Sequence, residues 1–378
     1  MTSLRDVFIT GTGTHLPGAA VSNERIEDFI GRVAGRDSLM GRRALRWNGV
    51  QTRHYALDEA GAATDSNAGM CAKATHRALA DAGLGSSDMT FLAAATTQGD
   101  FLVPGHAAQV HGEIGCGPLE IASFQSVCGS SLMAAKSAWL QVRAGEHDVA
   151  VACAGEFSSR WFRPSFYDGT ALVDEKGRLC GEADFLRFTL SDGAGAVVME
   201  ALPNPAAMSL KVEFIDIVSL AGSFDPCMWA GARRDERGEA HATWSHQGPV
   251  AAHAAGQVAL LQDFTLLKQV IRAWVGEYLK KVDTGRIQPA SVDWLLCHYS
   301  AESLRDELMR LLETTDGAIA PEKWFSNLKS VGNIGSASIW VMLDEFVKSG
   351  RLKKGEKVLC VVPESGPAFV GFMMLEAV

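Results

Sequence analysis

Cys128 lies in a short run of small residues that joins a strand-like segment to a helix-like one. The run Ser126-Val-Cys-Gly-Ser-Ser131 follows the apolar stretch 120–124 and precedes a helical pattern over 131–144. A cysteine at the start of a helix lies beside free N–H groups, which favour an anion. We therefore expect a lowered thiol pKa and a role as nucleophile. The alternative is a buried structural cysteine, a common role for this residue.

Two further side chains could assist such a nucleophile. His298 directly follows the apolar segment 294–297, and open α/β sheets place functional groups at the carboxyl ends of strands. Its imidazole could act as a general acid or base, or donate a hydrogen bond. Asn333 lies in Val331-Gly-Asn-Ile-Gly-Ser336, where its carboxamide could donate a hydrogen bond to a developing enolate or oxyanion. The alternatives are a hydrogen-bonded histidine in a turn and an asparagine that caps a helix.

Other motifs are weaker. Gly11-Thr-Gly13 begins like a dinucleotide fingerprint, but Leu16 stands where the third glycine belongs. Arg42, Arg43 and Arg46 form a small basic cluster. This cluster is either a solvated helix face or a docking patch for an acidic partner.

These residues must be positioned by strands that alternate with helices. Short apolar runs alternate with segments of helical periodicity, which favours an α/β fold with a parallel or mixed sheet. We expect strands over 7–10, 90–95, 120–124, 148–153, 193–200, 209–217, 294–297, 324–327, 357–362 and 369–375. We expect helices over 66–82, 107–114, 131–144, 251–281, 301–314 and 337–349.

The chain also hints at two related halves. The turn at Ser126–Ser131 and the turn at Ser330–Ser336 are both clusters of small residues before a helix, about 200 residues apart. Pro203-Asn-Pro205 marks a break between halves at 1–203 and 204–378. The glycine-containing segment at about 222–248 predicts an irregular insertion, as a lid or entrance to a site.

Composition excludes several classes of protein. The 378 residues carry 35 Lys and Arg against 44 Asp and Glu, a formal charge of −9, which disfavours non-specific nucleic-acid binding. No run of 18 apolar residues predicts a membrane span, and the N-terminus lacks the apolar run of a signal peptide. Eight cysteines without a Cys-x-x-Cys pair favour a reducing, cytoplasmic location over a disulfide scaffold or a thiolate metal site.

With Cys128, His298 and Asn333 in this order, the sequence resembles the β-ketoacyl-acyl-carrier-protein synthase III branch of the thiolase-fold superfamily. Further pieces carry the resemblance: Ala95-Thr-Thr97, Leu190-Ser-Asp-Gly-Ala-Gly-Ala196 and Glu364-Ser-Gly-Pro-Ala-Phe-Val-Gly371. The resemblance implies a duplicated five-layered αβαβα fold with two pseudo-twofold-related halves, in a homodimer.

The same resemblance implies a mechanism. Cys128 would take an acyl group from an acyl carrier protein or acyl-coenzyme A thioester. His298 and Asn333 would hold a malonyl-type thioester and stabilise the enolate left when carbon dioxide departs. The backbone N–H groups of Cys128 and Gly366 would form an oxyanion hole, and no metal or redox cofactor is implied.

The sequence departs from this family at several positions. Tyr299-Ser-Ala-Glu302 replaces the Gln-Ala-Asn that often follows the catalytic histidine, and Arg43 and Trp47 do not keep the types used against coenzyme A. A starter acyl group linked to a carrier protein is therefore favoured over one linked to coenzyme A. Val103 replaces the phenylalanine of the family's dimer loop, and with Phe101 it is expected at the acyl tunnel or the dimer loop. These departures favour a specialised relative in polyketide or alkylresorcinol-type biosynthesis over housekeeping fatty-acid initiation.

Two alternatives on this fold stay open. The enzyme could transfer the Cys128-bound acyl group to an alcohol or amine without decarboxylation. The chain could also be the catalytically inactive subunit of a heterodimer. A biosynthetic thiolase is disfavoured because Cys360, the cysteine nearest to the C-terminal glycine turn, lies in the preceding strand. A hydroxymethylglutaryl-type synthase needs a glutamate from the first half, and the segment 96–101 supplies none.

Overall fold

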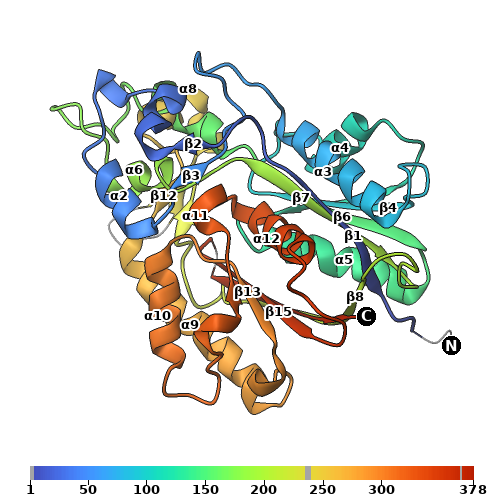
Figure 1. Cartoon of the computed structure of the whole chain (residues 1–378). Helices are drawn as coiled ribbons and strands as arrows, with labels where there is room; N and C mark the ends of the chain where they lie inside the picture. Colours follow the sequence, from blue (N-terminus) through green and yellow to red (C-terminus); the bar gives the residue numbers. More distant parts are fainter. Residues whose placement is uncertain (1–3, 235–239, 367) are drawn as a thin grey trace.

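The computed structural model, which describes residues 4–234, 240–366 and 368–378, is built on one mixed ten-stranded sheet (Figure 1). The strand order is β14-β13-β15-β16-β8-β1-β7-β6-β4-β5. The bounds are β1 Phe8–His15, β4 Phe91–Thr96, β5 Glu120–Gln125, β6 Val149–Glu156, β7 Gly193–Glu200, β8 Leu210–Ser219, β13 Trp294–Cys297, β14 Trp324–Phe325, β15 Lys357–Glu364 and β16 Phe369–Ala377. These are the ten strands expected from the sequence, with shifted bounds at several ends.

The sheet repeats one pairing pattern on either side of its middle. On one side β1 pairs antiparallel with β7, β7 antiparallel with β6, and β4 parallel with both β6 and β5. On the other side β8, β16, β15, β13 and β14 repeat these pairings in the same order. Only two residue pairs join β1 to β8. The sheet is therefore two five-stranded units of identical topology, and the proposed division at 203/204 falls between β7 and β8.

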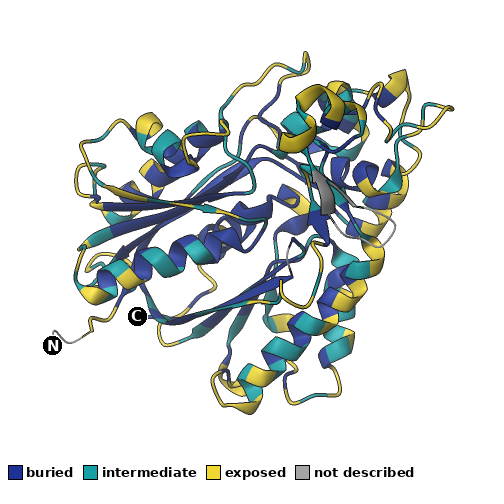
Figure 2. Ribbon diagram, turned by 180° about the vertical axis from the view of Figure 1, so that it is seen from behind, coloured by how far each residue is buried: buried dark blue, intermediate teal, exposed yellow. Residues whose placement is uncertain are grey.

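The helices divide these two units into layers. The remaining bounds are α1 Ile26–Ile30, α2 Gly41–Asn48, α3 Asn67–Ala82, α4 His106–Ile114, α5 Ser130–Ala144, α6 Gly181–Arg187, α7 Trp244–Gln247, α8 Pro249–Ala254, α9 Phe264–Asp283, α10 Glu302–Leu312, α11 Leu328–Val331 and α12 Ser338–Lys348. α5 and α12 share one apolar core with strands of both units, whereas α3 and α4 cover the first unit and α9 and α10 cover the second. The layers are thus α, β, α, β, α, and the strands are mostly buried (Figure 2).

Equivalent glycines let the two central helices approach the strands. A Cβ on Gly195 of β7 would lie 2.5 Å from the Cβ of Trp340 in α12. A Cβ on Gly371 of β16, the strand equivalent to β7, would lie 2.6 Å from Cδ1 of Leu132 in α5. Because neither distance is sterically allowed, each central helix depends on a strand glycine of the opposite unit.

The expected helix over 251–281 is wrong as a single element. α8 ends at Ala254, Gly256 has a positive φ of 73°, and α9 begins only after Asp263, whose side chain accepts hydrogen bonds from the N–H groups of Thr265 and Leu266. A left-handed glycine and a helix N-cap therefore separate two helices that share one apolar periodicity.

Short strands also interrupt the segment at about 222–248, which is less irregular than expected. These strands are β9 Met228–Trp229, β10 Ala232–Arg234 and β11 Ala240–Thr243; residues 235–239 lie outside the described part of the chain. β9 pairs with β12 (Leu261–Gln262), β10 with β11, and β2 (Val21–Ser22) with β3 (Thr52–Arg53). No helix in the described ranges is long and apolar enough to cross a membrane.

Candidate active site

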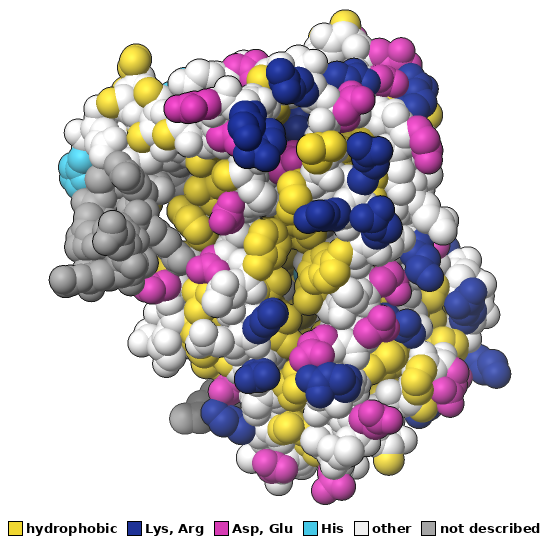
Figure 3. Space-filling view, turned by 90° about the vertical axis from the view of Figure 1, so that its left-hand side faces the viewer, with side chains coloured by type: hydrophobic (Ala, Val, Ile, Leu, Met, Phe, Trp, Pro, Cys, Tyr) yellow, Lys and Arg dark blue, Asp and Glu magenta, His cyan; other side chains and the backbone are white. Residues whose placement is uncertain are grey.

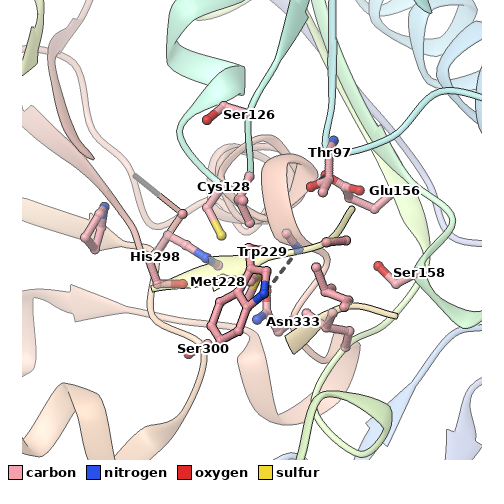
Figure 4. Close-up of a pocket in the computed structure, with 18 of the residues that line it drawn as sticks. Thr97, Ser126, Cys128, Glu156, Ser158, Met228, Trp229, His298, Ser300 and Asn333 are labelled. Atoms are coloured by element: carbon pink, nitrogen blue, oxygen red, sulfur yellow. Dashed lines mark hydrogen bonds between the residues drawn. The ribbon is translucent and has the colours of Figure 1, made fainter. Parts of the chain in front are cut away.

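A cavity of about 330 Å³ brings together the residues singled out from the sequence. Cys128, His298, Asn333 and Gly366 all line it, although they come from four separate connections. Figure 4 shows the Cys128 sulfur, the His298 imidazole and the Asn333 carboxamide converging on the same space.

Cys128 is held by the turn between β5 and α5. Its side chain is only 7% exposed. The hydroxyls of Ser130 and Ser131 donate to the carbonyls of Val127 (2.9 Å) and Cys128 (3.1 Å), which fixes the first turn of the helix. A Cβ on Gly129 would lie 2.3 Å from the Phe369 ring, so only glycine fits directly after the cysteine.

The expected lowering of the Cys128 pKa is wrong. Burial raises the pKa of the thiol well above its usual range, and the carboxylates of Glu364 and Glu156 raise it further. The Gly129 N–H at the start of α5 already donates to Oε2 of Glu364, at 2.6 Å. The helix end on which the expectation depended is therefore occupied by an internal carboxylate, and Cys128 rests as a neutral thiol.

His298 follows β13 and its backbone N–H donates to the Val361 carbonyl of β15, at 2.8 Å. Within the described residues its imidazole makes no hydrogen bond to protein. Burial lowers the pKa of His298 to about 4, so the ring is neutral at physiological pH. A neutral imidazole can accept a proton at one nitrogen and donate one at the other.

Asn333 is fixed through both its backbone and its side chain. Its carbonyl accepts from the Ser191 N–H at 2.8 Å, and its Oδ1 accepts from the Gly335 N–H at 2.9 Å. The Nδ2 group has no partner in the described part of the protein. This arrangement leaves one amide donor available to a molecule in the cavity.

Gly366 lies in the turn after β15. The carbonyls of Gly366 and Ser365 accept from the N–H groups of Cys227 (2.8 Å) and Met228 (2.9 Å), which anchors the turn to the start of β9. Among the described residues, neither the Cys128 N–H nor the Gly366 N–H donates to the backbone of another residue. Both amides are thus available for the oxyanion hole, which stays a proposal.

Glu156, at the end of β6, is a cavity residue that sequence reasoning missed. The glutamate sought over 96–101 is absent there, but this one reaches the same space from the first half. Its Oε1 accepts from Thr97 N (3.0 Å), Thr97 Oγ1 (2.8 Å) and Ser336 Oγ (2.6 Å). Burial raises the pKa of Glu156 to about 7. The sequence signal that could have indicated Glu156 was an acidic residue at the end of an apolar strand.

The rest of the cavity wall is largely apolar. Met228 and Trp229, from the segment predicted as a lid, form one part. Leu267 and Trp274 of α9 and Leu308 of α10 form another. Trp274 and Leu308 also line a second, smaller apolar cavity of about 40 Å³ beneath these two helices. The two spaces together suit an acyl chain.

Two groups of sequence-predicted residues do not line this cavity. Phe101 and Val103 are 62% and 82% exposed and do not line the cavity of their own chain, so their place at the acyl tunnel or the dimer loop stays a prediction. Arg42, Arg43 and Arg46 are exposed on α2, where they border a separate surface groove with Arg36 and Arg178. On the face that carries α2, α6 and α10, Lys and Arg side chains surround an apolar hollow (Figure 3). Across the described ranges, no cluster of three or more His, Cys, Asp or Glu could hold a metal ion.

Comparison with known proteins shows which family this chain is similar to. Residues 282–373 match the family model of the 3-oxoacyl-[acyl-carrier-protein] synthase III C terminal, and residues 121–204 match the β-ketoacyl synthase N-terminal domain. A β-ketoacyl-[acyl-carrier-protein] synthase III from Synechococcus sp. (strain RCC307) is 27% identical over 364 residues, covering 94% of this chain and 93% of its own. The chain is a β-ketoacyl synthase III-like condensing enzyme.

Solved structures place this condensing enzyme in the thiolase fold. AbyA1, a tetronic acid condensing enzyme, superposes with a TM-score of 0.75 at 20% identity, over 98% of this chain and 99% of its own. OleA from Xanthomonas campestris superposes with a TM-score of 0.75 at 17% identity, over 99% of both chains. The duplicated, layered architecture is therefore that of the β-ketoacyl synthase III-like enzymes.

Proposed function

We propose that this enzyme transfers an acyl group from a thioester to Cys128 and then condenses it with a malonyl-type carrier-protein thioester, with loss of carbon dioxide. The observation that carries this proposal is the convergence of the Cys128 thiol, the neutral His298 imidazole and the free Asn333 amide on one apolar-walled cavity.

In the first step the Cys128 sulfur attacks the acyl carbonyl. His298 accepts the thiol proton and returns it to the departing thiol, so that acyl-Cys128 and a free carrier thiol are formed. Because Cys128 and His298 are both neutral at rest, proton transfer has to accompany the attack. The N–H groups of Cys128 and Gly366 stabilise the oxyanion.

In the second step the malonyl thioester loses carbon dioxide. The electron pair of the broken C–C bond forms an enolate, whose oxygen accepts hydrogen bonds from His298 and the Asn333 Nδ2 group. The enolate carbon attacks the acyl carbonyl, and the Cys128 sulfur leaves and is reprotonated. The product is a β-ketoacyl thioester on the carrier.

A carrier protein is the proposed acyl carrier, in fatty-acid, polyketide or alkylresorcinol-type biosynthesis in the cytoplasm. α2, with the exposed Arg42, Arg43 and Arg46, packs beside α10, which lines the cavity. Acidic carriers would meet this basic face. Acyl-coenzyme A stays a second donor to be tested.

We also propose a homodimer formed at β5, the edge strand of the sheet. Phe101, Leu102 and Val103 form an exposed apolar loop near this edge, and Ile121 of β5 is 39% exposed. Such a patch on a sheet edge favours self-association. Sedimentation of the wild type as a dimer and of Leu102→Asp as a monomer would support this state.

Carbon dioxide release tests the reaction class. The acylated enzyme is incubated with malonyl-carrier protein labelled at the free carboxylate. Labelled carbon dioxide and a β-ketoacyl carrier are expected. Acyl transfer to an alcohol or amine without carbon dioxide would instead establish the acyltransferase alternative.

A further inference from the structure

Glu364 is a fully buried carboxyl group in the wall behind the nucleophile. It ends β15, two residues before Gly366, and it touches the Cys128 turn with both oxygens. Oε1 accepts a short hydrogen bond from the Ser126 hydroxyl, and Oε2 accepts from the Gly129 N–H at 2.6 Å. A Cβ on Gly366 would lie 3.0 Å from Oε1, so the carboxyl group packs between the Cys128 turn and the Gly366 turn.

No cation from the described parts of the chain pairs with this carboxyl group. The titratable groups around the Cys128 turn are Glu364 from β15, Glu156 from β6 and His298 after β13. Arg160 also lines the cavity, but its guanidinium pairs with Asp100 at 2.8 Å. Glu364 forms no ion pair within the described residues. Its charge therefore acts directly on the neighbouring sulfur.

We propose that Glu364 is a positioning residue that braces the Cys128 turn and, through its negative charge, keeps Cys128 a neutral thiol until an acyl thioester arrives. The proposal rests on the proposed role of Cys128 as nucleophile. Glu364 would thus prevent Cys128 from resting as a thiolate, the form that the start of α5 would otherwise stabilise.

This arrangement destabilises the thiolate form of Cys128 more than its thiol or acyl-thioester form. A free thiolate would stand beside the carboxylate and lack the Gly129 N–H, which Glu364 occupies. A thiol and an acyl-thioester are both uncharged, so the carboxylate opposes neither through its charge. The pKa of Glu364 itself is raised by burial, which outweighs the lowering by its donors Ser126, Gly129 and Val127.

Alkylation of Cys128 by iodoacetamide across pH tests the proposal, since only the thiolate reacts. Rates are read from the Cys128 peptide by mass spectrometry, with Cys128→Ala as the background control. Glu364→Gln can keep both hydrogen bonds, with its amide N–H₂ donating to the Ser126 hydroxyl. We expect it to shift the rate profile to lower pH and to react about tenfold faster at pH 7, the effect of lowering a pKa by one. An unchanged profile, or one moved to higher pH, in folded Glu364→Gln would overturn the proposal.

Ser126→Ala distinguishes the effect of the Glu364 hydrogen bonds from the effect of its charge, because the variant removes one donor and keeps the carboxylate. We expect its rate at pH 7 to stay within about threefold of the wild type, since removing a donor leaves the charge in place. A tenfold acceleration in this variant would assign the effect to a loosened turn.

The wild type provides a second measurement if Glu364→Gln does not fold. Two interacting groups titrate as a coupled pair, so the alkylation rate should rise by less than tenfold per pH unit while Glu364 titrates. Burial raises the pKa of Glu364 above 4.5, so a tenfold rise per unit from pH 4 upward would contradict the proposal. Glu156→Gln repeats the measurement without the other carboxyl group that acts on Cys128. Alkylation needs no thioester, so this result is independent of whether Cys128 can be acylated.

Discussion

Glu156 and Glu364 end the equivalent strands β6 and β15, and each braces the turn of the opposite half. Glu156, from the first half, accepts from Ser336 in the turn that carries Asn333. Glu364, from the second half, accepts from Gly129 in the turn that carries Cys128. Each half thus contributes one buried carboxyl group to the other half, and these contacts hold the Cys128 turn and the Asn333 turn at a common cavity.

The buried Glu156 should make stability depend on pH. Its pKa of about 7 in the folded protein lies above the usual glutamate value of 4.5, so the folded state binds more protons than the unfolded state between pH 5 and 7. The free energy of unfolding should therefore fall as pH rises through this range, by about 2 kcal/mol from this group alone. Urea denaturation at pH 5, 6 and 7 measures the slope.

Glu156→Gln should flatten that slope, because its amide does not titrate. Asp192, whose pKa burial raises to about 6, contributes in the same direction, so Asp192→Asn is the matched control and should flatten a lower part of the range. Equal slopes for wild type and Glu156→Gln would show that Glu156 does not carry this dependence.

The Nδ2 group of Asn333 should serve decarboxylation more than acylation. Asn333→Ala is expected to slow carbon dioxide release from the malonyl thioester about 100-fold, the usual cost of one oxyanion donor, while Cys128 is still acylated. Asn333→Asp keeps the acceptor for the Gly335 N–H and replaces only the donor. If Asn333→Asp restored normal release, the residue would act through the turn and not through its amide.

Trp274 should limit the length of the acyl chain. Its side chain lines both the main cavity and the smaller one beneath α9 and α10, and its buried Nε1 has no hydrogen-bond partner in the described structure. Trp274→Ala should join the two spaces and shift preference toward longer chains, at a cost of about 3–5 kcal/mol in stability. Competition among acyl thioesters of graded length, read as adducts on Cys128, measures the shift. Trp274→Phe keeps a ring between the cavities and should preserve the wild-type preference.

The basic face of α2 should bind the carrier protein. Reversing Arg42, Arg43 and Arg46 to Glu should raise the Kd for an acidic carrier at least tenfold, and the difference should shrink at high salt. Lys353→Glu with Lys354→Glu is the control, because these exposed residues precede β15 at the end remote from the cavity. Unchanged turnover of carrier-linked substrate by the α2 variant would refute this docking site.

The sequence predicted the strands well because each is a short apolar run bounded by polar residues or turns. Cys128 and His298 were singled out because they follow strand ends, and Asn333 because it lies in a turn of small residues. That the three act together was implied by the resemblance to the synthase III branch. The sign of the Cys128 pKa could not be predicted locally. It depends first on the burial of the thiol and then on Glu364, which contacts Gly129 from 235 positions along the chain. For the same reason Glu156 was missed, because a charged residue at a strand end is expected in solvent until the fold buries it.

Intact-mass spectrometry of the enzyme with acyl-carrier and acyl-coenzyme A thioesters determines whether Cys128 carries the acyl group into a decarboxylating condensation. We expect a single acyl adduct, mapped to the Cys128 peptide, absent from Cys128→Ala and discharged with carbon dioxide release when malonyl-carrier protein is added. An adduct that persists in folded Cys128→Ala, or no adduct from any of the donors, would contradict this expectation.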